Sequence, residues 1–300
     1  MSIIEYSGVT REFGKKKVLH GIDLKIDEPC IYGLVGRNGA GKSTLLKMIP
    51  CLLHATKGSV TVFNKDPWEN QDELKQKIGY LADNDLFPMT LRIEEFLDYN
   101  KSVYRKWDET MEAELLQRFK LKRDAKISTL SKGQKRQFAL ISILCFHPEV
   151  LILDEPAAGL DPAVRQEFLQ LVLERLGSAG ITVVFSSHHF ADIERLANRV
   201  GILHEGRLIE DASFDDYHKK YCKVIGEIDA DALEKIRAQP EFISVKDSCD
   251  LKQVTLKLSL NDVEQWAAGV GGIRIMDHQP VGLEELFIEL TGKELEEISQ

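Results

Sequence analysis

A glycine-rich run in the first part of the chain carries the residue types that hold phosphate groups. The eight residues Gly36-Arg37-Asn38-Gly39-Ala40-Gly41-Lys42-Ser43 fit the pattern G-x-x-x-x-G-K-[ST]. The glycines let backbone N–H groups turn toward phosphate oxygens, and a helix that begins after Gly41 presents its positive end to the same anion. Lys42 can reach the β and γ phosphates of a nucleotide, the Ser43 hydroxyl can ligate Mg²⁺, and the next residue, Thr44, is assigned to the same site. We therefore predict a nucleotide site here, rather than an ordinary glycine turn before a helix.

Two acidic residues end an apolar run further along the chain. Val150-Leu151-Ile152-Leu153 is followed by Asp154 and Glu155. A buried strand can carry a carboxylate only at its end, where the carboxylate meets solvent or a metal ion. We expect Asp154 to help hold Mg²⁺ through water, and Glu155 to polarise a water molecule near the γ-phosphate as a general base. The alternative is a solvated strand end, which the phosphate-binding run makes less favoured.

Strands and helices alternate through the region that contains both groups. Buried strands are expected at 30–35, 150–154 and 181–185, and the helices that follow them at 41–51, 163–176 and 190–197. Such alternation predicts an α/β fold, in which a parallel core sheet carries helices on its faces. Half-exposed strands at 3–9, 18–26 and 59–63 suit an added antiparallel sheet.

The rest of the chain predicts an insertion and a second domain. From about residue 83 to about residue 145 the strand pattern gives way to helical spacing, which indicates a helical insertion. The polar segment 212–221 marks a boundary, so that residues 1–212 form one domain and 222–300 a small α+β domain. The order of elements in the small domain, βαββαβ, is compatible with a ferredoxin-like unit, and a last helix is expected at 283–291.

Composition excludes several classes of protein. The chain has 300 residues, 43% hydrophobic and 29% charged, which suits a globular protein with one large and one small domain. Its formal net charge of −9 argues against a free nucleic-acid binder, so no nucleic-acid partner is expected. The first residues do not read as a signal peptide, and no apolar run is long enough to span a membrane. The five cysteines show no metal or redox spacing, which favours reduced thiols in a cytoplasmic protein.

A third motif lies between the two groups described first. Leu130-Ser131-Lys132-Gly133-Gln134 resembles the L-S-G-G-Q signature of ATP-binding cassette (ABC) ATPases, and the order of motifs over about the first 210 residues is that of this family. Ser131 is a good N-cap, Gly133 permits close backbone approach, and a helix N-terminus there faces an anion. The resemblance implies a P-loop NTPase cassette with ATP and Mg²⁺ as cofactors. It also implies that the anion is the γ-phosphate of ATP held by a second nucleotide-binding domain, and that the contacts come from Ser131, Lys132, Gly133 and Gln134.

Other positions resemble the family one at a time. Phe13 resembles the aromatic residue that stacks on adenine, with a core phenylalanine as the alternative. Gly159-Leu160-Asp161 resembles the D-loop, whose aspartate lies across the dimer interface. His188 matches the histidine that contacts the γ-phosphate and the attacking water; its neighbour His189 is the alternative, although the spacing from the preceding strand favours His188. The resemblance thus implies a catalytic set of Lys42, Glu155 and His188.

Two positions depart from the family pattern. Asp83 follows Ile78-Gly79-Tyr80-Leu81-Ala82, where the family has glutamine in contact with Mg²⁺ and the attacking water. An aspartate could ligate Mg²⁺ directly or through water, but it would repel the γ-phosphate when the metal is absent. Lys132 replaces the first glycine of the signature; its backbone N–H remains, and its charge favours phosphate.

The resemblance implies an ATPase subunit that drives a separately encoded membrane permease. The end of the chain, 283–292, resembles subunits of bacterial exporters, so the expected place is the inner face of the cell membrane, with the permease and a second nucleotide-binding domain as partners. The apolar run Leu86-Phe87-Pro88-Met89 is a candidate docking patch, with packing inside the helical insertion as the alternative. Two other functions stay open: a soluble ABC protein that acts on ribosomes or DNA, and an ATP-binding regulatory module with vestigial hydrolysis.

Overall fold

The chain forms two compact units, Met1–Asp211 and Ala212–Gln300. The structure is a computed structural model, and it describes residues 2–83, 87–176, 180–248 and 251–292. Each unit has its own sheets and its own apolar core, and each is described by itself.

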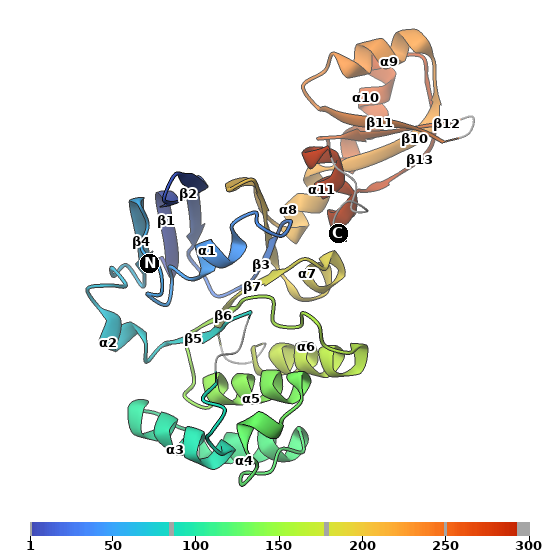
Figure 1. Ribbon diagram of the computed structural model, residues 1–300. Helices are drawn as coiled ribbons and strands as arrows, with labels where there is room; N and C mark the ends of the chain where they lie inside the picture. The colour runs from blue at the N-terminus through green and yellow to red at the C-terminus, as the bar shows by residue number, and fades with distance from the viewer. Residues whose placement is uncertain (1, 84–86, 177–179, 249–250, 293–300) are drawn as a thin grey trace. The chain divides into compact units, whose positions relative to one another are not determined.

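A six-stranded sheet forms the centre of the first unit (Figure 1). Its order is β5-β6-β7-β3-β8-β9, and the pairs from β5 to β8 are parallel. Parallel strands covered on both faces consist of continuous apolar runs, and all residues of β6 and β7 are buried. The strands are β3 (Ile31–Val35), β5 (Ile78–Leu81), β6 (Val150–Leu153), β7 (Thr182–Ser187), β8 (Arg199–His204) and β9 (Arg207–Ser213).

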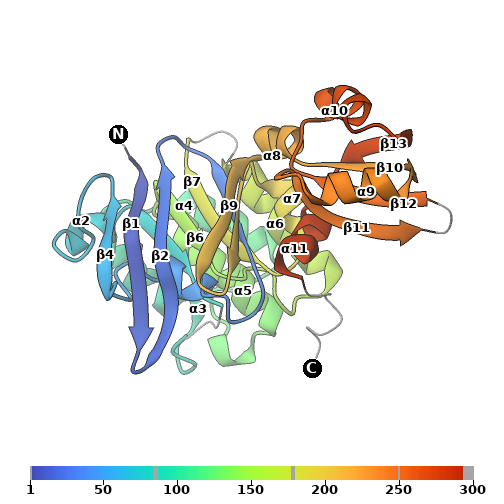
Figure 2. The same cartoon turned by 90° about the horizontal axis from the view of Figure 1, so that it is seen from above.

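A three-stranded antiparallel sheet packs beside this core, as the alternating patterns predicted. Its order is β2-β1-β4, and Figure 2 shows the three strands side by side. One face sends Ile4, Leu19 and Val62 into the same apolar core as Leu45 and Ile152. The core sheet and the added sheet therefore close around the loop that follows β3. The strands are β1 (Ile4–Phe13), β2 (Lys16–Ile26) and β4 (Lys57–Val62).

The predicted helical insertion is present between β5 and β6. It contains α3 (Ile93–Val103), α4 (Glu109–Arg118) and α5 (Lys132–Leu144), and Figure 1 shows α3 and α4 at the end of the unit away from β1, β2 and β4. Phe87 packs inside the insertion, with its ring centroid 5.3 Å from that of Phe96 and 5.2 Å from that of Phe138. Of the proposed docking patch, Leu86 lies outside the described residues, while Met89 is 44% exposed.

The helix after the glycine-rich run is shorter than the sequence suggested. We expected a helix over 41–51, but α1 (Lys42–Leu46) ends five residues earlier. Beyond Leu46 the backbone continues with i→i−3 hydrogen bonds, such as Ile49 N to Leu46 O. Pro50 explains the change, because it has no N–H and disfavours helical geometry in the residue before it.

Two further helices pack on the sheet of the first unit, and a short one precedes β5. They are α6 (Pro162–Leu176), α7 (Phe190–Leu196) and α2 (Gln71–Leu74). In α7, Ile193 lies so close to Gly33 of β3 that a Cβ on Gly33 would be 2.6 Å from the Ile193 side chain. The glycine in β3 thus allows the helix to pack directly on the strand.

The second unit contains a four-stranded antiparallel sheet in the order β11-β12-β10-β13. Helices α9 and α10 cover one of its faces (Figure 1), around a core that includes Cys222, Val224 and Val254. The chain order βαββαβ and this strand order support our proposal that the unit is a ferredoxin-like domain. The elements are β10 (Cys222–Ile228), α9 (Ala230–Arg237), β11 (Phe242–Ser248), β12 (Leu251–Leu256), α10 (Val263–Val270), β13 (Ile273–Pro280) and α11 (Leu283–Thr291).

The polar boundary segment forms a helix that the sequence interpretation did not include. Helix α8 (Phe214–Lys220) begins at Ser213, whose hydroxyl accepts a hydrogen bond from Asp216 N at 3.1 Å. Acidic residues in its first turn and basic residues in its last turn complement the helix dipole, and Tyr217 is fully buried. The polar residues that we took as a domain boundary therefore also start a helix.

No helix within the described ranges is both long enough and apolar enough to cross a membrane.

Candidate active site

The glycine-rich run forms a loop between β3 and α1. Gly39 and Gly41 have φ values of +81° and +109°, which side chains with a Cβ rarely adopt. Gly36 has a different reason to be glycine, since a Cβ there would lie 2.2 Å from Leu203 O. The three glycines thus shape a loop whose backbone can approach a ligand closely.

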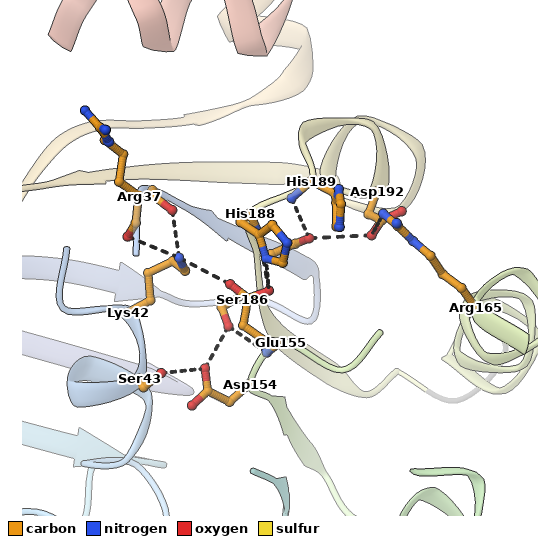
Figure 3. A network of polar contacts seen from close by, with 12 residues as sticks. Arg37, Lys42, Ser43, Asp154, Glu155, Arg165, Ser186, His188, His189 and Asp192 are labelled. Carbon is orange, nitrogen blue, oxygen red and sulfur yellow. Dashed lines mark hydrogen bonds and ion pairs between the residues drawn. The ribbon is translucent and has the colours of Figure 1, made fainter. Parts of the chain in front are cut away.

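Lys42 is the most enclosed cation at this loop. Its side chain is 5% exposed, and its ammonium group donates hydrogen bonds to Gly36 O at 2.7 Å and Arg37 O at 3.4 Å. The same Nζ lies 3.2 Å from Glu155 Oε1 (Figure 3). The lysine therefore points back along the loop, toward the place where the apolar strand ends.

Asp154 lies at the end of β6, below the loop. Its Oδ1 accepts hydrogen bonds from Ser43 Oγ at 2.9 Å and from Ser186 Oγ at 2.8 Å. Burial raises the pKa of the Asp154 carboxyl group, and the nearby charges of Asp83 and Glu155 raise it further, although the two serine hydroxyls act in the opposite direction.

Glu155 lies just after β6, and its hydrogen bonds connect it to Ser186 near the end of β7 and to His188 in the loop after β7. Its backbone has a φ of +47°, a left-handed geometry that non-glycine residues adopt mainly where surrounding contacts hold them. Here the backbone N–H of Glu155 donates to Ser186 Oγ at 2.9 Å. Its Oε2 lies 2.7 Å from His188 Nδ1 and also accepts from His188 N at 3.3 Å (Figure 3).

The two histidines take different places. His188 contacts Glu155, whereas the backbone N–H of His189 donates to Ser187 Oγ at 3.0 Å and its ring stacks obliquely on that of His188. Burial lowers the pKa of the His189 imidazole, and the nearby His188 adds to this. The structure thus brings His188, and not His189, to the carboxylate of Glu155.

A cavity of about 390 Å³ opens beside these groups. Glu155 and Asp83 line it together with most of the glycine-rich run, and Lys16 and Val18 of β2 form another wall. The residues of the glycine-rich loop and the start of α1 that line the cavity were all predicted as site residues: Arg37, Asn38, Gly39, Gly41, Lys42, Ser43 and Thr44.

The signature residues do not line this cavity, as far as the described residues show. Ser131 caps α5, where its hydroxyl accepts from Gln134 N at 3.2 Å and Gln134 Oε1 accepts from Ser131 N at 3.0 Å. Lys132 extends toward the D-loop, because a Cβ on Gly159 would lie 2.4 Å from its Nζ. In one copy of the chain, the signature therefore forms a separate surface at a helix N-terminus.

Phe13 and Asp161 also lie away from the cavity lining. The Phe13 side chain is 46% exposed, so it is not a core residue, and the Arg11 guanidinium lies 4.5 Å from its ring centroid. Asp161 starts α6, with its Oδ1 accepting from Val164 N at 3.1 Å. Their contacts with nucleotide and with a second domain stay predictions.

Arg136 and Ser186 are residues of this network that the sequence interpretation missed. Arg136 of α5 is 2% exposed, and its guanidinium donates to the carbonyl oxygens of Ala82, Asp154, Glu155 and Pro156. For Arg136 the available signal is its place just before the largely apolar run 138–144 of α5, where a charged side chain lies next to buried positions. For Ser186 the signal is its place at the end of a strand parallel to β6, because such ends meet at one edge of the sheet.

Ser43, which lines the cavity, and Asp154, which is hydrogen-bonded to it, fit a divalent cation. Asp154 Oδ2 is buried and has no hydrogen-bond partner among the described residues. A buried carboxylate oxygen without a donor is destabilising unless a cation or an ordered water satisfies it. Ser43 Oγ shares the other oxygen of the same carboxylate, so hydroxyl and carboxylate oxygens converge in the way that Mg²⁺ prefers.

Comparison with known proteins agrees with this geometry. Residues 19–158 match the family model described as ABC transporter. The Nod factor export ATP-binding protein I of Burkholderia lata is 31% identical over 98% of each chain. The bacitracin transport ATP-binding protein BcrA of Bacillus licheniformis is 32% identical over 75% of this chain and 74% of that one.

A solved ATP binding subunit of an ABC transporter superposes with a TM-score of 0.66, at 25% identity, over 72% of this chain and 92% of that one. The P-loop cassette fold predicted from the motifs is therefore confirmed. The chain belongs to the ABC transporter ATP-binding proteins, and is an ATP hydrolase that binds ATP with Mg²⁺.

Proposed function

We propose that this chain powers a separately encoded membrane permease and that the transporter exports its substrate. The names of two relatives, bacitracin transport and Nod factor export, support a transporter subunit, and the second name supports a direction outward. In this proposal the chain lies at the inner face of the membrane, where the permease holds it.

The observation that carries the proposed mechanism is the position of Glu155 between Lys42 and His188. Lys42 is placed to bind the outer phosphates of ATP, since its ammonium lies on the wall of the cavity that the loop encloses. Glu155 accepts a proton from the attacking water, and the water oxygen forms a bond to the γ-phosphorus. The bond from that phosphorus to the β–γ bridging oxygen breaks, so that ADP and phosphate leave.

His188 and Ser186 hold the base in place for this step. The contact at 2.7 Å between His188 Nδ1 and Glu155 Oε2 fixes the carboxylate, and Ser186 fixes the backbone of the same residue. Ser43 and Asp154 would hold Mg²⁺, which would supply positive charge to the phosphate oxygens.

A second nucleotide-binding domain completes the site in this proposal. The signature helix begins at Ser131 and presents the positive end of its dipole there, but this surface does not line the cavity of its own chain within the described residues. In a dimer, this helix end faces the γ-phosphate of ATP that is bound by a second copy or a related chain. ATP then joins the two domains, and hydrolysis lets them separate.

We place the permease on a groove of the helical insertion. A cavity of about 300 Å³ lies between β5 and α3, with Leu81, Phe87, Phe96 and Ile143 among its apolar walls. Its wall at Ala82 directly precedes Asp83 of the nucleotide cavity, so a segment seated there is one residue from the ATP site. The exposed Met89 belongs to the same insertion.

The test is the oligomeric state of the Glu155→Gln variant with ATP. Removing the general base leaves the phosphate-binding loop intact, so the variant should hold ATP without hydrolysing it and accumulate as a dimer. Sedimentation velocity with and without Mg²⁺ and ATP measures this, with the permease present if it has been found.

Two variants provide the controls for this experiment. Adding Lys42→Ala to Glu155→Gln should abolish the dimer by removing phosphate binding, and adding Ser131→Arg should abolish it by blocking the signature surface. If Glu155→Gln stays monomeric at saturating ATP, with and without permease, the shared site is wrong.

A further inference from the structure

Asp83 lies where the strand beside β6 leads into the nucleotide cavity. It is exposed, follows β5 by two residues, and lines the same cavity as Ser43 and Glu155. In the family that the motifs resemble, this position is a neutral glutamine, so the present chain carries one additional negative charge in its ATP site.

The backbone that leads to Asp83 is attached to the strand end that carries the other carboxylates. The guanidinium of Arg136 donates to the carbonyl oxygen of Ala82 and also to those of Asp154 and Glu155, the latter two at 3.1 and 2.9 Å. One buried side chain therefore fixes the residue before Asp83 relative to both acidic residues that follow β6.

A buried carboxylate lies beside the cavity that Asp83 lines. Asp154 accepts a hydrogen bond from Ser43 Oγ at 2.9 Å, and Ser43 lines that cavity together with Asp83. Asp154 is 1% exposed and its Oδ2 has no hydrogen-bond partner among the described residues. An unpartnered, buried carboxylate oxygen inside the field of a second carboxylate is an environment that attracts a cation.

We propose that Asp83 makes the Mg²⁺ site of this ATPase a two-carboxylate site, which binds a divalent cation before nucleotide arrives and admits ATP only together with the cation. The proposal rests on the function proposed above, because it places the cation beside Ser43 and Asp154. Glutamine would offer an oxygen without charge, whereas aspartate adds one unit of attraction for the cation. Without a cation, the carboxylates of Asp83, Asp154 and Glu155 together oppose the charge of the triphosphate, and Lys42 offsets only part of it.

The first measurement is Mn²⁺ binding without nucleotide, followed by the electron paramagnetic resonance signal of free Mn²⁺. Asp83→Asn keeps the shape of the side chain and removes its charge, and Asp83→Gln restores the family residue. Both should weaken Mn²⁺ binding by about tenfold or more. The matched control is Asp27→Asn, which removes the same charge from a side chain that is 53% exposed and paired only with Lys25 among the contacts described; it should leave binding within about twofold.

In the second measurement, the Asp83 variants are expected to bind their ligand more tightly than the wild type, not more weakly. ATP binding in the presence of EDTA, measured by equilibrium dialysis, should be about tenfold tighter in both Asp83 variants than in the wild type. If the wild type binds no Mn²⁺ without nucleotide, or if both variants match the wild type in either measurement, the proposal is overturned. Failure of the proposed function would look different, because Glu155→Gln would then stay monomeric at saturating ATP whatever the Asp83 variants do to Mn²⁺ binding.

Discussion

Arg136 shows how a single side chain can set the geometry of two acidic residues through their backbone. It is buried, and its guanidinium donates to the carbonyl oxygens of Ala82, which follows β5, and of Asp154, Glu155 and Pro156, which follow β6. Carbonyl oxygens at strand ends need donors, and a planar guanidinium can serve several of them at fixed angles. The left-handed backbone of Glu155 is thereby supported from the helix side by Arg136 and from the strand side by Ser186.

We predict that Arg136→Lys lowers the rate of ATP hydrolysis more than it lowers ATP affinity. Lysine keeps the charge but cannot donate to four carbonyl groups in one plane, so the loop that carries Glu155 should lose its fixed position while Lys42 and the glycine-rich loop keep theirs. We expect kcat to fall by about tenfold or more and KM to stay within about threefold. Steady-state phosphate release at varied ATP checks this.

Lys135→Arg, one position earlier on α5, is the matched control and should keep wild-type kinetics. If Arg136→Lys lowers kcat and circular dichroism shows that the variant is also partly unfolded, Arg136 has a structural role only, and its positioning role is contradicted.

The elements that carry the site were predictable where their reasons are local. The apolar runs of β3, β6 and β7 identify buried parallel strands, and the glycines at the end of β3 identify the phosphate-binding loop. The motifs also supplied Lys42 and Asp154, because spacing within a motif is a property of the sequence.

Other features depend on the folded chain and could not be derived from spacing. Ser186 meets Asp154 only because β6 and β7 pair in parallel, and Arg136 meets Ala82 only because α5 packs on β5. The early end of α1 reflects Pro50, a local signal that helical periodicity outweighed in our interpretation. Helix α8 was not predicted, because the serine that caps it and the acidic residues of its first turn are also common in turns.

Asp108 allows the contribution of one helix cap to be measured at the element scale. Its Oδ1 accepts from Met111 N at 2.8 Å at the start of α4, and its Oδ2 lies 3.0 Å from His147 Nε2. The Met111 N–H, with His147 as a further cause, lowers the pKa of Asp108 in the folded state. A lowered pKa means that the carboxylate stabilises the fold above its unfolded pKa of about 3.9 and ceases to do so as pH falls through the folded value.

We predict that Asp108→Ala lowers the free energy of unfolding by about 1 kcal/mol at neutral pH, and by less below about pH 4. Urea unfolding followed by tryptophan fluorescence in a Trp266→Phe background measures the first unit alone, since the other two tryptophans, Trp68 and Trp107, lie there. Asp27→Ala, which caps no helix, is the control. A loss that does not depend on pH would contradict the role of the carboxylate.

At the scale of the whole molecule, the chain separates into a unit that holds the ATP site and a unit with its own core. All residues that line the nucleotide cavity lie within Met1–Asp211. The second unit buries Val224, Ile236, Val254 and Val263 around its own four-stranded sheet. Polar contacts such as Lys223 Nζ to Glu285 Oε2, at 2.8 Å, attach α11 to the sheet of the same unit.

We predict that a chain cut after Asp211 still folds and binds ATP with Mg²⁺ within about threefold of the full chain, because no residue of the cavity lining is removed. Circular dichroism and isothermal titration with a non-hydrolysable ATP analogue check the two parts of this expectation. The full chain with Lys42→Ala is the control for loss of binding with an intact fold. A truncated chain that keeps its helices and strands but no longer binds the analogue would show that the ATP site depends on the second unit, and the independence of the two units would then be wrong.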